Sequence, residues 1–254
     1  MEVNFNTNKV SFKAGLTPVL RKEIQHTDCK AVQNIIKDTF ETKADFAGNK
    51  LLAKLMHDSL NICRQISEKY KLPFDIYPPK IKVYNNQELA SYEDVHFGFC
   101  IGEKFKVLKK EPEYPVRSVF IKNIKDSASI FNDSVDKWYK MNIISSDSVF
   151  LPFLHELMHN IHMKLVFDKS GYDKGLIEMK KMSGQMPSFD RCIIRDEIGE
   201  YASKSKAELF PEVVSKLICE SMDEDNIITK NPMDNLKNLP EFIRSFIKNQ
   251  IGIL

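Results

Sequence analysis

Residues 150–165, FLPFLHELMHNIHMKL, place two histidines four positions apart with a glutamate directly after the first. On an α-helix, positions i and i+4 lie on one face, about 40° apart around the axis and about 6 Å along it. The imidazoles of His155 and His159 therefore point the same way and can share one tetrahedral zinc ion. Glu156 lies about 100° from His155, beside the metal rather than on it. A carboxylate in that place can take a proton from metal-bound water, which is typical of metallopeptidases.

The residues around this motif favour a buried helix. Glu156 is the only charged residue between Pro152 and Ile161. Leu157 and Ile161 fall on the face opposite the histidines. Pro152 fits the first turn of a helix, where its missing N–H costs little. The alternative is an amphipathic helix whose histidines bond neighbouring groups, and a motif this short arises by chance in on the order of one chain per hundred.

A zinc site also needs a third protein ligand. His162 is almost in line with His155 around the helix but lies about 10 Å further along the axis, so we expect it to pack rather than to bind metal. The HxxGxxH continuation of metzincins is absent, and a carboxylate must therefore complete the site. The candidates downstream are Asp196, Glu197, Glu200, Glu208, Glu212 and Glu220.

Glu208 and Glu212 are the strongest of these candidates because they share one helical face with apolar residues. A carboxylate on the inner face of a buried helix needs a partner, and a metal ion is one. The second carboxylate can then accept a hydrogen bond from a ligand histidine and select its tautomer. The alternative is that both are ordinary acids facing solvent.

HELMH at 155–159, followed by YASKSKAELFPEVV at 201–214, resembles the catalytic domain of anthrax lethal factor and its relatives. These are zinc endopeptidases of the glutamate-zincin group. Their HExxH motif is followed by a tyrosine and, seven positions later, by a glutamate in a stretch similar to A-E-x-F-x-E. Tyr201 and Glu208 keep that step here. The resemblance covers residues 150–254, including the closing LPEFIRSFIKNQI, and before that extends only to the order of elements.

The resemblance implies a zincin-like fold and one zinc ion held by His155, His159 and Glu208. Glu156 would be the general base. Tyr201 would donate a hydrogen bond to the oxyanion that forms when water attacks a peptide carbonyl. The implied activity is that of a zinc metalloendopeptidase acting on protein or peptide substrates.

The resemblance further implies that Glu212 contacts a ligand histidine. The sequence departs from the family at Pro211, where a small residue is usual. Because proline removes a helical hydrogen bond, the helix either begins near Leu209 or is kinked beside the metal. In either case Glu212 is the alternative third ligand to Glu208.

Helical spacing within residues 28–75, a β-rich middle section and a mainly helical C-terminal half together predict an α+β fold. We expect one catalytic domain over residues 28–254, preceded by a flexible N-terminal extension over residues 1–27. The sheet is expected to be small and either mixed or antiparallel, with strands at 81–85, 96–108 and 115–124. In zincins an edge strand beside the motif helix binds extended peptide, and the strand at 115–124 is predicted to be that edge or its neighbour.

The composition gives no sign of a nucleic-acid partner, a membrane span or a disulfide framework. The chain has 37 Lys plus Arg against 35 Asp plus Glu, a formal charge of +2 that gives no reason to expect nucleic acid or a membrane surface. No apolar run approaches the roughly 18 residues of a membrane span, and no signal peptide is recognisable. The five cysteines form no CxxC pair and predict no disulfide framework. We expect a cytoplasmic protein, or one exported without a classical signal peptide, and the sequence does not predict its oligomeric state.

Two other interpretations stay open. One is a regulatory metallopeptidase of the kind that cleaves phage-type repressors, although those enzymes carry their third carboxylate closer to the motif and usually accompany a DNA-binding domain. The other is a catalytically silent module with the zincin fold that only binds partners. The presence of Glu156 argues against the silent module, since a degenerate site need not keep its base.

Overall fold

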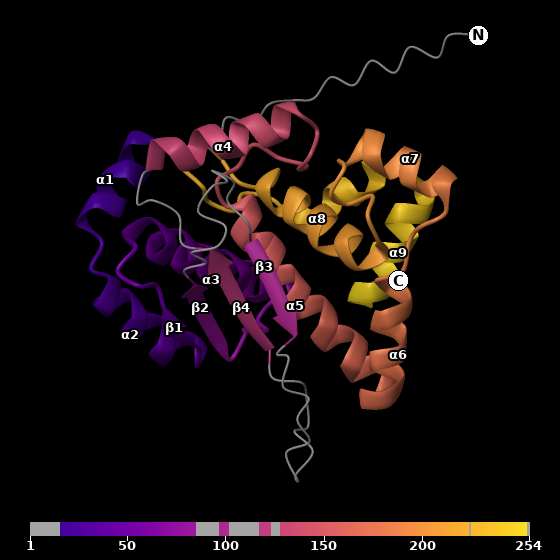
Figure 1. The fold of residues 1–254 in the computed structure, drawn as a ribbon, viewed down its shortest axis with the longest axis horizontal. Coiled ribbons are helices and arrows are strands. Elements are labelled where there is room, and N and C mark those ends of the chain that lie inside the picture. Colours follow the sequence, from indigo (N-terminus) through magenta and orange to yellow (C-terminus); the bar gives the residue numbers. More distant parts are fainter. Residues whose placement is uncertain (1–15, 85–96, 102–116, 123–127, 224, 253–254) are drawn as a thin grey trace.

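The computed structural model describes residues 16–84, 97–101, 117–122, 128–223 and 225–252 (Figure 1). In chain order, its elements are α1 (Pro18–His26), α2 (Cys29–Phe40), β1 (Lys43–Asp45), α3 (Lys50–Tyr70), β2 (Lys80–Tyr84), β3 (Phe97–Ile101), β4 (Arg117–Lys122), α4 (Ala128–Lys140), α5 (Leu151–Ser170), α6 (Tyr172–Met182), α7 (Ser188–Glu197), α8 (Lys206–Cys219), the 3₁₀ helix η2 (Pro232–Asn238) and α9 (Glu241–Ile251). The described part is mainly helical with one small sheet, which confirms the α+β class.

The sheet has four strands in the order β1-β2-β4-β3. β1 and β2 are parallel, as are β2 and β4, whereas β3 runs antiparallel to β4, so the sheet is mixed. In the register, Val119 of β4 lies opposite Ile81 of β2 and Phe99 of β3. The strand predicted at 115–124 corresponds to β4, which lies inside the sheet next to β3, and β3 forms one edge. Residues 102–108 of the predicted middle strand lie outside the described residues.

Helix α5 is the central element of the fold. It contacts α3, β3 and β4 on one side and α6, α8 and α9 on the other, and Figure 1 shows it running between the sheet and the orange and yellow C-terminal helices. A helix with apolar residues on every face is stable only when it is buried all round. Consistent with this, residues 151–158 of α5 are all buried. Within the described residues, no helix is both long enough and apolar enough to cross a membrane.

The flexible extension predicted over residues 1–27 is wrong for residues 16–27. Thr17 caps α1 by accepting a hydrogen bond from the N–H of Leu20, and Pro18 occupies the first turn. Leu20 and Ile24, four positions apart, are buried in the main core, and α1 packs against α3. Val19, Leu20 and Ile24 are its three aliphatic residues, and Val19 is exposed, so the pattern is too short to show a clear helical period and the sequence did not predict this helix. Residues 1–15 lie outside the described part of the chain.

Candidate metal centre

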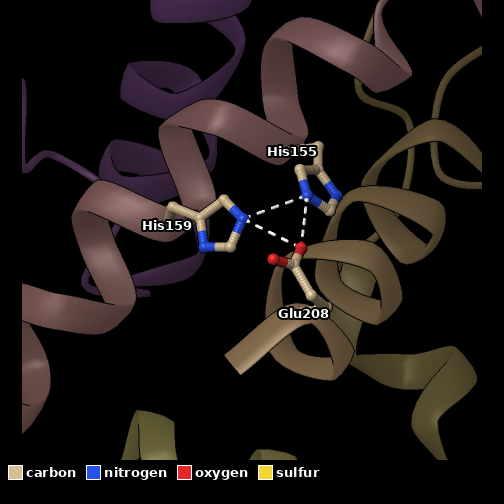
Figure 2. A group of neighbouring side chains, drawn as sticks. All are labelled: His155, His159 and Glu208. Atoms are coloured by element: carbon tan, nitrogen blue, oxygen red, sulfur yellow. Dashed lines mark hydrogen bonds and ion pairs between the residues drawn. The ribbon is translucent and has the colours of Figure 1, made fainter. Parts of the chain in front are cut away.

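Three side chains from α5 and α8 meet where these two helices pack against each other (Figure 2). The Nε2 atoms of His155 and His159 are 3.1 Å apart, and each lies 3.2 Å from Oε2 of Glu208. A tetrahedral zinc ion with ligands at about 2.0–2.1 Å separates its ligand atoms by about 3.3–3.4 Å. The three observed distances are close to that spacing, so these residues can hold a metal ion without rearrangement.

Local structure at the start of α8 presents Glu208 to the histidines. Ser205 is the N-cap of α8, and its hydroxyl accepts a hydrogen bond of 3.2 Å from the N–H of Glu208. Serine followed three residues later by glutamate is the pattern of a capping box, in which the glutamate turns back to the cap. Here the Glu208 carboxylate instead contacts the two imidazoles of α5.

Of the two alternatives considered for this helix, a start near Leu209 is wrong and the one with Pro211 inside the helix is the one observed. α8 begins at Lys206, and Pro211 lies inside it. Proline has no N–H, so the carbonyl of Ala207 loses its helical partner. The missing bond lies in the turn that follows Glu208, and Glu208 still faces both histidines.

We expect Ser205→Ala to lower the free energy of unfolding by about 1 kcal/mol, because the Glu208 N–H loses its cap. It should also weaken metal binding, since that cap fixes the turn that carries Glu208. Chemical denaturation and metal titration measure the two effects. Asn49→Ala removes the corresponding cap of α3, whose side chain accepts from the N–H of Leu52, and should cost stability alone. Equal metal affinities in the two variants would contradict the prediction.

Glu212 contacts the opposite nitrogen of a histidine in the cluster. Its side chain is buried, and Oε2 lies 2.8 Å from Nδ1 of His155, within ion-pair distance although not aligned as a regular hydrogen bond. Its other oxygen, Oε1, accepts a 2.7 Å hydrogen bond from the N–H of Ser145. A carboxylate on Nδ1 orients the ring and leaves Nε2 free for a metal. Glu212 therefore lies on the Nδ1 side of His155, whereas Glu208 lies on the Nε2 side, next to the other two possible ligand atoms.

Glu156 is a buried carboxylate beside the cluster. Its side chain is 3% exposed, and its Oε2 has no hydrogen-bond partner among the described residues. Burial raises the pKa of this carboxyl, while His159 and His155 act in the opposite direction. A buried polar atom without a partner is costly in a native protein and marks a place where a water or a substrate group is expected.

Tyr201 also borders the cluster. Its ring meets the ring of His155 edge-on, with centroids 5.3 Å apart, and the Nζ of Lys204 lies 3.7 Å from the centroid of the tyrosine ring. Burial raises the pKa of Tyr201 well above its usual value, and the carboxylates of Glu208 and Glu156 raise it further. The phenol therefore stays protonated and is available as a hydrogen-bond donor.

The charges of the cluster are coupled. Burial lowers the pKa of His155, but its contacts with Glu208 and Glu212 outweigh burial and raise that pKa to about 10. Burial likewise raises the pKa of Glu208, but the bonds from His155 and His159 dominate and hold it well below its usual range. Without a metal ion, the centre at neutral pH is therefore an ion pair between protonated His155 and ionised Glu208.

His162 does not join the cluster, as expected. It is fully buried, its Nε2–H donates to Oε1 of Gln250 at 3.1 Å, and its ring stacks on Phe210 with centroids 4.2 Å apart. Burial lowers its pKa to about 3, so it is neutral. Of the carboxylates proposed as third ligands, only Glu208 belongs to the group of possible metal ligands found among the described residues.

Comparison with known proteins adds nothing to this geometry. No family model, no curated protein and no solved structure matches the chain. What the centre can do therefore follows from its own atoms.

Proposed function

We propose that this protein is a zinc-dependent endopeptidase that hydrolyses peptide bonds in protein substrates. One observation carries the proposal. Two imidazole nitrogens and one carboxylate oxygen lie 3.1–3.2 Å from one another, and the residue after the first histidine is a buried carboxylate, one oxygen of which has no partner among the described residues. The residues involved are those that carry the resemblance to the lethal-factor group of glutamate zincins, and a zincin-like fold is part of the proposal.

Each residue has a role that its surroundings support. Zinc held by His155, His159 and Glu208 would act as a Lewis acid and bring the pKa of a bound water to about 7. Glu156 accepts the proton of the attacking water and can pass it to the departing amine, a transfer helped by its raised pKa. Tyr201 stays protonated and donates a hydrogen bond to the developing oxyanion.

The substrate proposed for this site is an extended stretch of polypeptide. β3 pairs with β4 on one side and has no partner on its other side among the described strands. It also contacts α5, the helix that carries the two histidines. An extended peptide can add to such an edge through main-chain hydrogen bonds, which would bring a peptide bond near the centre.

The test combines metal content with peptide cleavage. Purified protein is expected to contain about one zinc ion per chain by elemental analysis, as one tetrahedral site requires. It should cleave members of a peptide library, lose this activity to a chelator and regain it with added zinc. Zinc-loaded protein that cleaves no peptide would support the silent binding module. Failure to take up zinc would show that the site is an ordinary buried cluster of charged side chains.

Zinc binding is also expected to release protons. Because the pKa of His155 is raised to about 10 in the metal-free protein, zinc must displace its proton at neutral pH. The apparent affinity should therefore rise by about tenfold per pH unit between pH 7 and 9. Calorimetry in buffers of different ionisation enthalpy counts the protons. Glu212→Gln is the control, since it removes one charge that raises this pKa and should reduce the release. A binding constant independent of pH would contradict the prediction.

A further inference from the structure

The four residues Asn142–Ser145 form a turn that connects α4 to the segment before α5. Asn142, two residues after the end of α4, has the left-handed conformation, with φ of 57°. Its N–H bonds to the carbonyl of Tyr139, and the N–H of Ile143 bonds to the carbonyl of Trp138, both at 2.9 Å. This is the hydrogen-bond pattern of a Schellman motif, and asparagine tolerates the left-handed position better than most residues. The turn is thus anchored at its first residue.

The same turn holds the backbone of Tyr201. The carbonyl of Asn142 accepts a hydrogen bond of 2.8 Å from the N–H of Glu200, and the carbonyl of Ile143 accepts one of 3.0 Å from the N–H of Tyr201. The Asn142 side chain donates from Nδ2 to the carbonyl of Arg195 at 2.8 Å, in the last turn of α7. Asn142 therefore bonds both to the last turn of α7 and to Glu200, the residue before Tyr201.

At its other end the turn reaches the ligand histidine through Glu212. The N–H of Ser145 donates to one oxygen of Glu212, and the other oxygen lies 2.8 Å from Nδ1 of His155. One short turn consequently contacts the element that carries Tyr201 and the carboxylate that orients His155. These two side chains come from separate segments, and the turn connects them.

Gly199 lies where the turn and the tyrosine segment approach each other closely. A Cβ at this position would lie 3.3 Å from the carbonyl oxygen of Ile143 and 3.4 Å from that of Asn142. Its φ of +154° is also one that side-chain-bearing residues rarely adopt. Both neighbours are backbone atoms and cannot rotate away, so a larger residue would push the two segments apart.

We infer that the turn Asn142–Ser145 is a positioning element for catalysis, and that Asn142 and Gly199 are the residues that set the place of the Tyr201 hydroxyl. The inference rests on the proposed peptidase function. A hydrogen-bond donor stabilises an oxyanion only when it lies within about 3 Å of it, and a displacement of about 1 Å can cost up to 100-fold in rate. Asn142 and Gly199 act through Tyr201 and do not themselves touch the substrate.

Two substitutions test this from opposite sides. Asn142→Gly keeps the left-handed backbone and removes the bond to the Arg195 carbonyl, whereas Gly199→Ala adds the Cβ that meets the turn. Each is expected to lower kcat by about tenfold, with KM changed by less than about twofold and zinc content unaltered. In a Tyr201→Phe background, both substitutions should change kcat by less than about twofold, because the hydroxyl that they position is absent.

Gly252→Ala is the matched control. Gly252 also has a positive φ, of 78°, but it ends α9, and a Cβ there meets no atom of the described chain within 4 Å. It should lower thermal stability without changing kcat. Unchanged kcat in Asn142→Gly, or equal losses with and without the Tyr201 hydroxyl, would overturn the inference and leave the peptidase proposal standing. Zinc-loaded wild-type protein that cleaves no peptide would overturn both.

Discussion

Glu156→Gln is expected to abolish peptide cleavage while the protein keeps its zinc. The substitution preserves the size and burial of the side chain but removes the carboxylate proposed to accept a proton from the attacking water. General-base catalysis by a positioned carboxylate contributes about 10²–10⁴-fold, so kcat should fall by about 10²–10⁴-fold. Turnover of a library-selected peptide, measured beside zinc content, gives the two quantities.

The fold should tolerate this change. Burial already disfavours the charged form of Glu156, and its Oε2 has no partner among the described residues. A neutral amide therefore lowers the free-energy cost of burying this side chain. The melting temperature is therefore expected to stay the same or to rise. Glu68→Gln, on an exposed carboxylate of α3, is the matched control and should leave kcat unchanged. A Glu156→Gln enzyme with near-normal kcat would exclude Glu156 as the base.

The second large effect is a difference in zinc affinity between variants of the two carboxylates of α8, Glu208 and Glu212. Glu208→Ala is expected to weaken zinc binding by more than about 100-fold, because its oxygen lies 3.2 Å from both Nε2 atoms and faces the centre. Glu212→Ala should weaken binding by about 10–100-fold, the usual cost of losing a group that orients a ligand. Glu212 contacts Nδ1 of His155, on the side away from the centre, and the N–H of Ser145.

Competition with a chromophoric zinc chelator measures both affinities, and the two variants act as controls for each other because they lie four residues apart on one helix. Glu208→Ala should also lose all cleavage at limiting zinc. Glu212→Ala is expected to recover cleavage when excess zinc is supplied, since its three ligands are intact. If Glu212→Ala had the larger effect on zinc affinity, the assignment of the third ligand would be reversed.

Some of the fold was predictable because its signals are local. Helical spacing was predicted within residues 28–75, and the structure places α2 and α3 there. β1 was missed because three residues cannot show an alternating pattern, and its pairing with β2 is a long-range contact. The strand at 115–124 was recognised as a strand, but its place inside the sheet depends on which strands pair with it.

Local patterns likewise predicted some residues of the candidate centre, whereas others depended on tertiary packing. His155, Glu156 and His159 followed from the sequence because helical periodicity alone brings residues i and i+4 to one face. Glu208 and Glu212 could not be distinguished on that basis, since they are also four residues apart and share a face. Their roles depend on how far along α5 the helix α8 crosses, which is decided by packing.

The sequence by itself determined the histidine pair, the carboxylate beside it and the α+β class, because each depends on the geometry of a single helix or on the order of elements. Only the tertiary structure decided that Glu208 meets both imidazoles, that Glu212 contacts the opposite nitrogen, and that the turn Asn142–Ser145 connects to Tyr201. The turn acts through backbone N–H and carbonyl groups, which every residue except proline carries in full. The pattern of residue types along the chain cannot predict such contacts, because they form only when distant segments pack together.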